Sequence, residues 1–227
     1  VGKPTITFGL SYGSQSIPNF EKPSVLNAEQ LRQFRLEFYE DREFALGILG
    51  PREIAERDRL EALGPQGAGV DWFDEITRTA PFSQYNVGIN GGNENIRYNV
   101  STNYTQQEGT LINTGFERFS IRANMDVDVT DRIQFGLDFS PTRTVATGGR
   151  TDAGANNFSV YNAVSLSRWT DPSAAVFRED GTLTNVANGD IVPFYNANPV
   201  YLLNAREEER RTNQILMGSY LKIKILE

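Results

Sequence analysis

Apolar and polar side chains alternate strictly along several short segments, beginning near the first residue of the chain. Between Pro4 and Tyr12, the even positions after the proline carry Ile, Phe, Leu and Tyr, whereas the odd positions carry Thr, Gly or Ser. A period of two places successive side chains on opposite faces of a strand, so such a segment has one apolar and one polar face. The same pattern recurs in Tyr85–Ile89, Ile96–Tyr104, Phe119–Val129, Ile133–Phe139 and Ile215–Ile225. The sequence therefore predicts six strands and a mainly β fold.

The connections between these predicted strands alternate in length. Residues 91–94 and 129–132 form short turns, whereas residues 14–83, 106–115 and 141–208 form long connections. Short turns on one side and long loops on the other are typical of outer-membrane β-barrels. We therefore predict antiparallel up-and-down strands of a transmembrane β-barrel. Such barrels have at least about eight strands, so about six strands predict a partial barrel and a piece of a larger protein.

A largely helical insertion is expected near residues 27–63, within the first long connection. Asn27 followed by Gln30 has the spacing of a capping box, which begins a helix. Gly47 and the Gly50-Pro51 pair end that helix, and a second, strongly charged helix is expected to run from Arg52 to Leu63. After Ser140 the chain is expected to be irregular until about Glu208.

Composition excludes several classes of function. The formal net charge is −7, whereas nucleic-acid binding requires a basic face. The chain contains neither Cys nor His, which removes thiolate chemistry, the commonest zinc ligand and the side chain most often used for proton transfer near neutral pH. No segment approaches the roughly 18 consecutive apolar residues that indicate a transmembrane helix. We therefore expect no enzyme, no cofactor and no metal site.

Several ordered motifs carry a resemblance to a known family. The segment 71–81 reads DWFDEITRTAP, residues 85–94 read YNVGINGGNE and residues 97–98 read RY. Farther along, residues 104–109 read YTQQEG and residues 113–120 read NTGFERFS. This succession resembles the motifs that open the barrel of SusC/RagA-like TonB-dependent outer-membrane transporters. The likeness is close over residues 70–140 and looser over the rest of the chain.

The resemblance implies a location in the chain of such a transporter. In that family a plug domain precedes a barrel of about 22 strands. Residues 1–227 are then the N-terminal portion of the barrel without the plug, and residues 27–63 and 141–208 form extracellular loops. The implied function is energy-coupled uptake of oligosaccharides or peptides across the cell outer membrane. The implied partners are a SusD-like surface lipoprotein, the TonB complex through the missing N-terminal part, the glycan or peptide substrate and the lipid bilayer.

Aromatic residues in the last long connection are the candidates for contact with a ligand. They are Phe158, Tyr161, Trp169, Phe177, Phe194, Tyr195 and Tyr201. Such rings form a platform on which sugars stack, but they also form a local core under a long loop or a girdle at the membrane interface. The ligand-contact hypothesis is placed on Trp169, Tyr161, Tyr195 and Phe194.

Two acidic clusters allow a further interpretation. Asp71, Asp74 and Glu75 beside Trp72 have the residue types of a glycosidase site, but Asp and Glu also favour the start of a helix, and that interpretation is preferred. Asp126 and Asp128 together with Asp131 suggest calcium, yet in a strand they alternate onto the polar face and lack the loop spacing of a calcium motif.

Two other classes of protein remain open at this point. A secreted glycan-binding β-sandwich would also show alternating strands and aromatic loops, but it would bury the inward faces of two sheets against each other. A glycoside hydrolase would need a second carboxylate at about 5 to 9.5 Å from the first.

Overall fold

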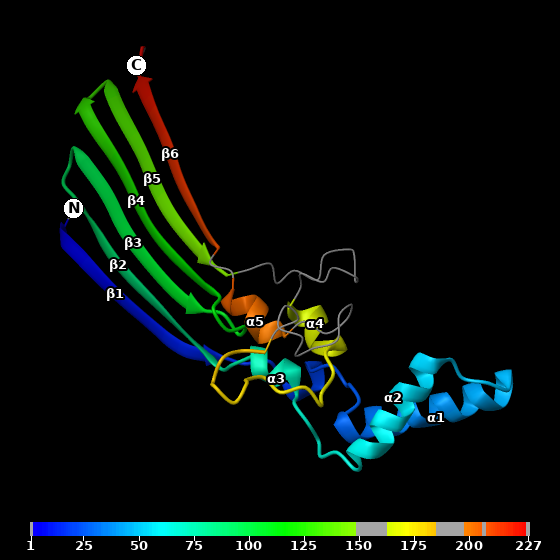
Figure 1. Cartoon of the computed structure of the whole chain (residues 1–227). Coiled ribbons are helices and arrows are strands. Elements are labelled where there is room, and N and C mark those ends of the chain that lie inside the picture. Colours follow the sequence, from blue (N-terminus) through cyan, green and yellow to red (C-terminus); the bar gives the residue numbers. More distant parts are fainter. Residues whose placement is uncertain (1, 149–162, 185–197, 206–207, 226–227) are drawn as a thin grey trace. The chain divides into compact units, whose positions relative to one another are not determined.

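The computed structural model describes residues 2–148, 163–184, 198–205 and 208–225. The chain divides into two compact units. The sheet unit comprises Val1–Ile17, Arg78–Gly149 and Glu207–Glu227, and the helical unit comprises Pro18–Thr77 and Arg150–Arg206. The elements of the two units are labelled in Figure 1.

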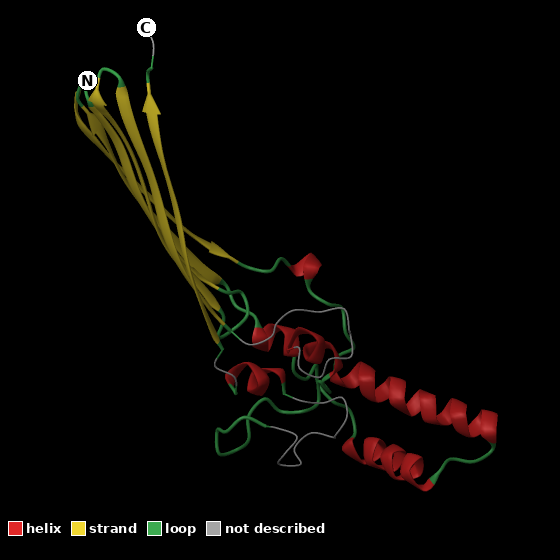
Figure 2. Cartoon of the chain, turned by 90° about the horizontal axis from the view of Figure 1, so that it is seen from above, coloured by secondary structure: helices red, strands yellow, loops and turns green. Residues whose placement is uncertain are grey.

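The sheet unit contains six strands in a single antiparallel sheet. Their order in the sheet is their order in the chain, so each strand pairs with its sequence neighbours, and the strands appear as one layer in Figure 2. The strands are β1 (Gly2–Gln15), β2 (Ala80–Gly92), β3 (Ile96–Glu108), β4 (Gly115–Thr130), β5 (Ile133–Thr147) and β6 (Glu209–Ile223). The predicted up-and-down arrangement of six strands is confirmed. The sheet is not closed, because β1 and β6 lie at its two edges.

The register of the strands gives the sheet one apolar and one polar face. One row of paired residues across all six strands is Ile6, Ile89, Val100, Ala123, Phe139 and Met217. The adjacent row, on the opposite face, is Thr5, Asn90, Asn99, Asn124, Asp138 and Gly218. Each residue of the second row lies next in the chain to a residue of the first, so the alternation seen in the sequence sorts side chains onto two faces.

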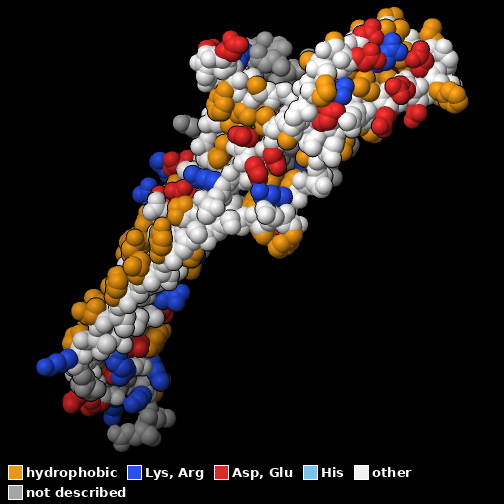
Figure 3. All heavy atoms as spheres, turned by 90° about the horizontal axis from the view of Figure 1, so that it is seen from below, with side chains coloured by type: hydrophobic (Ala, Val, Ile, Leu, Met, Phe, Trp, Pro, Cys, Tyr) orange, Lys and Arg blue, Asp and Glu red, His pale blue; other side chains and the backbone are white. Residues whose placement is uncertain are grey.

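The apolar face is exposed. Ile6, Phe8 and Met217 are each 69–70% exposed, and further large apolar residues of β1 and β6 are also exposed. Figure 3 shows hydrophobic side chains gathered in a strip along the sheet. A water-soluble sheet covers its apolar face with other protein, so this face requires a different environment.

Most strands extend farther than the alternation predicts, and the largest differences are at the end of β5 and the start of β6. β5 was expected to end at Phe139 but continues to Thr147, and β6 begins at Glu209 rather than at Ile215. Thr147 pairs with Glu209, so backbone pairing continues along residues 209–214 of β6, whose side chains are all polar. Residues 141–208 are therefore not irregular throughout, and the segment between β5 and β6 also contains α4 (Ala163–Trp169) and α5 (Pro199–Asn204).

The predicted helical insertion near residues 27–63 is confirmed. It consists of α1 (Ala28–Leu46) and α2 (Pro51–Leu63). Asn27 and Gln30 form the expected capping box, and Gly47 ends α1 in the left-handed conformation at φ 74°. A short 3-10 turn, η1 (Asn19–Glu21), precedes these helices, and α3 (Trp72–Ile76) follows them.

The core of the helical unit lies where α3, α4 and α5 pack together. Its buried apolar residues there are Trp72, Phe73, Ile76, Ala163, Leu166, Val200 and Leu203. Among the described residues, no helix is both long and apolar enough to cross a membrane.

Candidate functional site

Of the four candidates for contact with a ligand, Trp169 lies within the described residues. It is the last residue of α4 and its side chain is 58% exposed, as a ring that stacks on a ligand must be. Two other aromatic residues of the same unit, Phe177 and Tyr201, are also exposed. Tyr161, Phe194 and Tyr195 lie outside the described residues. The ligand-contact hypothesis therefore stays a prediction.

The acidic cluster at residues 71–75 starts a helix, as the preferred interpretation predicted. Asp71 accepts hydrogen bonds from the amides of Phe73 at 3.0 Å and Asp74 at 3.2 Å, which caps α3. Asp74 forms an ion pair with Lys22, in which Nζ and Oδ1 are 2.5 Å apart. Asp71 caps the helix and Asp74 pairs within the fold, which favours the helix-start interpretation over a glycosidase site.

Trp72 is a core residue and offers no surface to a sugar. Its side chain is 2% exposed, and its Nε1 donates a 2.9 Å hydrogen bond to the backbone oxygen of Asp171. The next residue, Pro172, accepts a 2.8 Å hydrogen bond from the amide of Val70. The segment 171–172 is thus held against α3, and this packing positions the end of α4 where Trp169 lies.

Asp171 also connects α1 to this core. Its Oδ2 lies 2.8 Å from Nη1 of Arg35. Burial opposes the charged form, but hydrogen bonds from the hydroxyl and amide of Ser173, together with Arg35, outweigh it and lower the pKa of Asp171 below its ordinary value. The carboxylate therefore stabilises the helical unit as an anion.

Asp126 and Asp128 of β4 lie on the polar face of the sheet, where the alternation places them. Asp126 accepts a 2.6 Å hydrogen bond from the hydroxyl of Tyr220, and Asp128 pairs with Arg97 at 3.4 Å. Within the described residues, no three acidic side chains are grouped as metal ligands.

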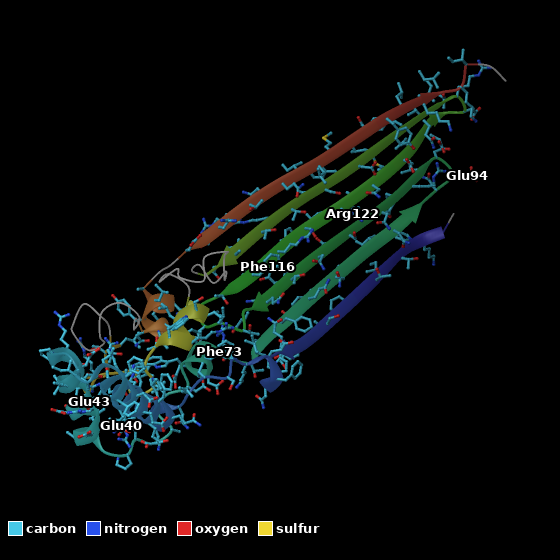
Figure 4. All side chains as sticks on the ribbon, turned by 90° about the vertical axis from the view of Figure 1, so that its right-hand side faces the viewer. Glu40, Glu43, Phe73, Glu94, Phe116 and Arg122 are labelled. Atoms are coloured by element: carbon cyan, nitrogen blue, oxygen red, sulfur yellow. The ribbon has the colours of Figure 1, made fainter. Side chains whose placement is uncertain are left out.

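An open hollow of about 570 Å³ lies at the end of the sheet that carries the short turns. The charged residues that line it are Glu94, Arg97, Asp128, Asp131, Arg132, Lys222 and Lys224. Figure 4 labels Glu94 at this end of the sheet. The hollow mixes both signs of charge, so its lining favours no single class of ligand.

Sequence reasoning missed two groups of exposed residues. On the polar face, Arg118 and Arg122 of β4 are exposed and form no ion pair with any described residue; Figure 4 shows Arg122 in the middle of the sheet. On α1, Phe34 and Phe38 are exposed one helical turn apart. The helical spacing of these phenylalanines is visible in the sequence, but the sequence does not show which face of the helix stays exposed.

The fold defines a class of protein. An antiparallel up-and-down sheet with one apolar face exposed and one polar face is the wall of a transmembrane β-barrel, here with six strands and not closed.

Comparisons with known proteins agree with this class. No family model matches the chain. It is 28% identical over 96% of its length to TonB-dependent receptor P3 of Formosa agariphila, and 41% identical over 31% of its length to TonB-dependent receptor SusC of Bacteroides thetaiotaomicron. A structure of the RagAB peptide importer in the closed-closed state matches the whole chain with a TM-score of 0.68 and 18% identity.

The chain spans only part of these proteins. It covers 19% of receptor P3, 7% of SusC and 27% of the matched RagAB chain. The resemblance to SusC/RagA-like TonB-dependent transporters, which the motifs indicated, is confirmed.

Proposed function

We propose that this chain is part of an outer-membrane transporter for TonB-dependent uptake of oligosaccharides or peptides, acting with a SusD-like surface lipoprotein. The observation that carries the proposal is the sheet, whose apolar face is exposed while its polar face bears Asn, Ser, Thr and charged residues. In a barrel of such strands the apolar face contacts lipid and the polar face lines the interior.

The lengths of the strands support a membrane-spanning role. The shortest strands, β2 and β3, have 13 residues each, and β4 has 16. A tilted strand needs about 9–11 residues to cross the hydrocarbon core, so every strand of this sheet is long enough.

The open edges of the sheet support membership of a larger barrel. In lipid, each unpaired backbone group costs several kcal/mol, so only closed barrels cross a membrane with strands. The outer edges of β1 and β6 therefore need further strands as partners. Residues 1–227 then form the N-terminal portion of the barrel, and residues 27–63 and 141–208 belong to extracellular loops.

Energy coupling through the TonB complex removes the need for a catalytic residue. The relatives are receptors and transporters rather than enzymes. The substrate is an oligosaccharide or a peptide; the second possibility is favoured by the peptide importer among the structural neighbours. Trp169, Tyr161, Phe194 and Tyr195 remain the proposed contacts with the substrate.

The secreted glycan-binding β-sandwich has less support. A sandwich needs two sheets that bury their inner faces against each other. All six described strands belong to one sheet, and its apolar face is exposed.

The proposal is tested with the native gene product. Cells are fractionated and probed with antibody against residues 1–227, and uptake of labelled oligosaccharides and peptides is compared between wild-type, gene-deletion and TonB-deficient strains. We expect an outer-membrane band several times larger than this 25.4 kDa chain, and uptake that requires both the gene and TonB. A band near 25 kDa in the soluble or secreted fraction would contradict the proposal.

A further inference from the structure

One face of α1 carries exposed phenylalanines and acidic residues in a single stripe. Phe34, Glu37, Phe38, Asp41 and Phe44 follow one another at intervals of three or four residues or lie side by side, so they share a face of the helix. We call this set the α1 stripe. Phe34 is 56% exposed, Phe38 48% and Phe44 94%. Three large apolar rings on one exposed helix face form an apolar patch of the kind that marks an interaction site.

Ion pairs of other α1 residues already hold the helix in place. Arg42 pairs with Glu53 at 2.9 Å, and Glu43 pairs with Arg57 at 3.0 Å, so both contacts join α1 to α2. Arg35 pairs with Asp171 at 2.8 Å. With the capping box at its start and Gly47 at its end, α1 needs no contact of the α1 stripe in order to fold. The stripe is therefore a preformed surface that is exposed in this chain.

The α1 stripe is acidic as well as apolar. Glu37 and Asp41 are exposed and form no ion pair with any described residue, and the same holds for the neighbouring Glu40. The other two acidic residues of α1 are paired, Glu29 with Arg32 and Glu43 with Arg57. Figure 4 labels Glu40 and Glu43 on this helix, and Figure 3 shows acidic and hydrophobic side chains interspersed over α1 and α2.

These two properties identify the partner by its chemistry. Rings that recur once per helical turn are the anchors of a helix that lies in an apolar groove of another protein. Covering the carboxylates of Glu37 and Asp41 costs free energy unless the partner brings cations to them. A membrane surface is disfavoured because anionic headgroups repel acidic side chains. A second copy of this chain is disfavoured because a two-fold contact would bring identical acidic stripes together.

We propose that the α1 stripe is a docking surface for a protein partner that presents an apolar groove bordered by Lys and Arg. The inference rests on the proposed function, in which that partner is the surface lipoprotein. Phe34 and Phe38 enter the groove, Phe44 covers its end, and Glu37 and Asp41 pair with the basic border.

The contact is tested by photo-crosslinking in the full-length protein in its native outer membrane. A benzoylphenylalanine replaces Phe38, and a matched control replaces Phe177, which is 55% exposed in the same unit. We expect a covalent adduct with the lipoprotein from position 38 and a much weaker one from position 177. The crosslinked peptide of the lipoprotein should contain apolar residues beside Lys or Arg.

Substitutions provide the second measurement. E37K combined with D41K, and separately F34A combined with F38A, are expected to reduce the lipoprotein that copurifies with the transporter by about tenfold or more, as loss of central anchors does. Glu179→Lys and Phe177→Ala are the matched controls, because both residues are exposed in the same unit, and they should change copurification less than about twofold. The charge-reversal variant keeps the test valid if the alanine variant folds poorly.

The outcomes separate the two proposals. If wild-type protein retains the lipoprotein and both double variants retain it equally, the docking surface is wrong while the proposed function stands. A crosslink from position 38 to a second copy, or to another segment of the same chain, also overturns the docking surface. If wild-type protein retains no lipoprotein, both the docking surface and the lipoprotein partner in the proposed function are wrong.

Discussion

The hydroxyl of Tyr220 on β6 donates a 2.6 Å hydrogen bond to Asp126 on β4, across the intervening strand β5. The bond spans two strands because the ring of Tyr220 lies over Gly136, its partner in the register of β5 and β6. A side chain at position 136 would occupy that space: a Cβ there would lie 2.0 Å from Cε1 of Tyr220. Because Gly136 has no side chain, Tyr220 of β6 reaches over β5 to Asp126 of β4 on the polar face.

Gly136→Ala should break this connection. The added methyl group displaces the ring of Tyr220, and we expect a loss of about 1–3 kcal/mol in the free energy of unfolding. Tyr220→Phe removes the hydrogen bond alone and should cost about 1 kcal/mol. Urea unfolding of the full-length protein in lipid vesicles measures both values. Gly218→Ala is the control, because the nearest atom to its new Cβ is 3.9 Å away; an equal loss in that variant would contradict the explanation.

The assignment of the two sheet faces is tested by adjacent residues of β3. Val100 lies in the apolar row, and Ser101 points to the opposite face. Val100→Arg should destabilise the folded barrel by about 2–4 kcal/mol if this row lies near the middle of the bilayer, whereas Ser101→Arg should cost much less. The folded fraction after refolding into vesicles is read from heat-dependent gel mobility. A larger loss for Ser101→Arg would mean that the faces are reversed.

Trp72→Phe should weaken the helical unit. The substitution keeps an aromatic ring in the core but leaves the part-buried backbone oxygen of Asp171 without its donor, which costs about 1 kcal/mol. Limited proteolysis of the full-length protein should show faster cleavage within residues 18–77. Trp169→Phe is the matched control, since that side chain is 58% exposed, and its cleavage rate should stay near that of the wild type.

The helical unit should loosen in acid. Hydrogen bonds from Arg32 and from the amide of Gln66 lower the pKa of Glu29 to about 2 from an ordinary 4.5. A carboxylate with a lowered pKa stabilises the fold fully above its ordinary pKa and loses that contribution as the pH falls through its folded value. We therefore expect hydrogen-exchange protection of α1 to decrease between pH 4.5 and about 2. Glu29→Gln should remove part of this dependence, and an unchanged pH profile in that variant would argue against the role of Glu29.

Trp169→Ala tests the predicted contact with substrate. If its exposed ring stacks on a sugar or a peptide group, the variant should raise the KM of uptake several-fold, in line with roughly 0.5–1.5 kcal/mol for an aromatic contact, while the amount of transporter in the membrane stays constant. Phe20→Ala serves as the control, because Phe20 is an exposed ring of the same unit and is not a ligand-contact candidate. Equal KM values for Trp169→Ala and the wild type would remove Trp169 from the candidate site.

The sequence by itself determined the features that depend on near neighbours in the chain. A period of two assigned side chains such as Ile6 and Thr7 to opposite faces, because alternation is a property of any extended backbone. The three-residue spacing of Asn27 and Gln30 identified the start of α1, since both partners of a capping box lie within one turn. The preferred interpretation of Asp71 as a helix start was correct for the same reason.

Only the tertiary structure decided the features that join distant residues. Trp72 appeared in the sequence beside a cluster of carboxylates, and its burial depends on Asp171, 99 residues away in the chain. The continuation of β5 to Thr147 depends on pairing with Glu209, because residues 141–147 carry no regular alternation of apolar and polar side chains. The contact of Tyr220 with Asp126 requires the register of three strands, and the exposure of Phe34 and Phe38 depends on which face of α1 packs against its neighbours. Local patterns specify the conformation of each segment, whereas contacts between segments decide which side chains are buried and which remain available for binding.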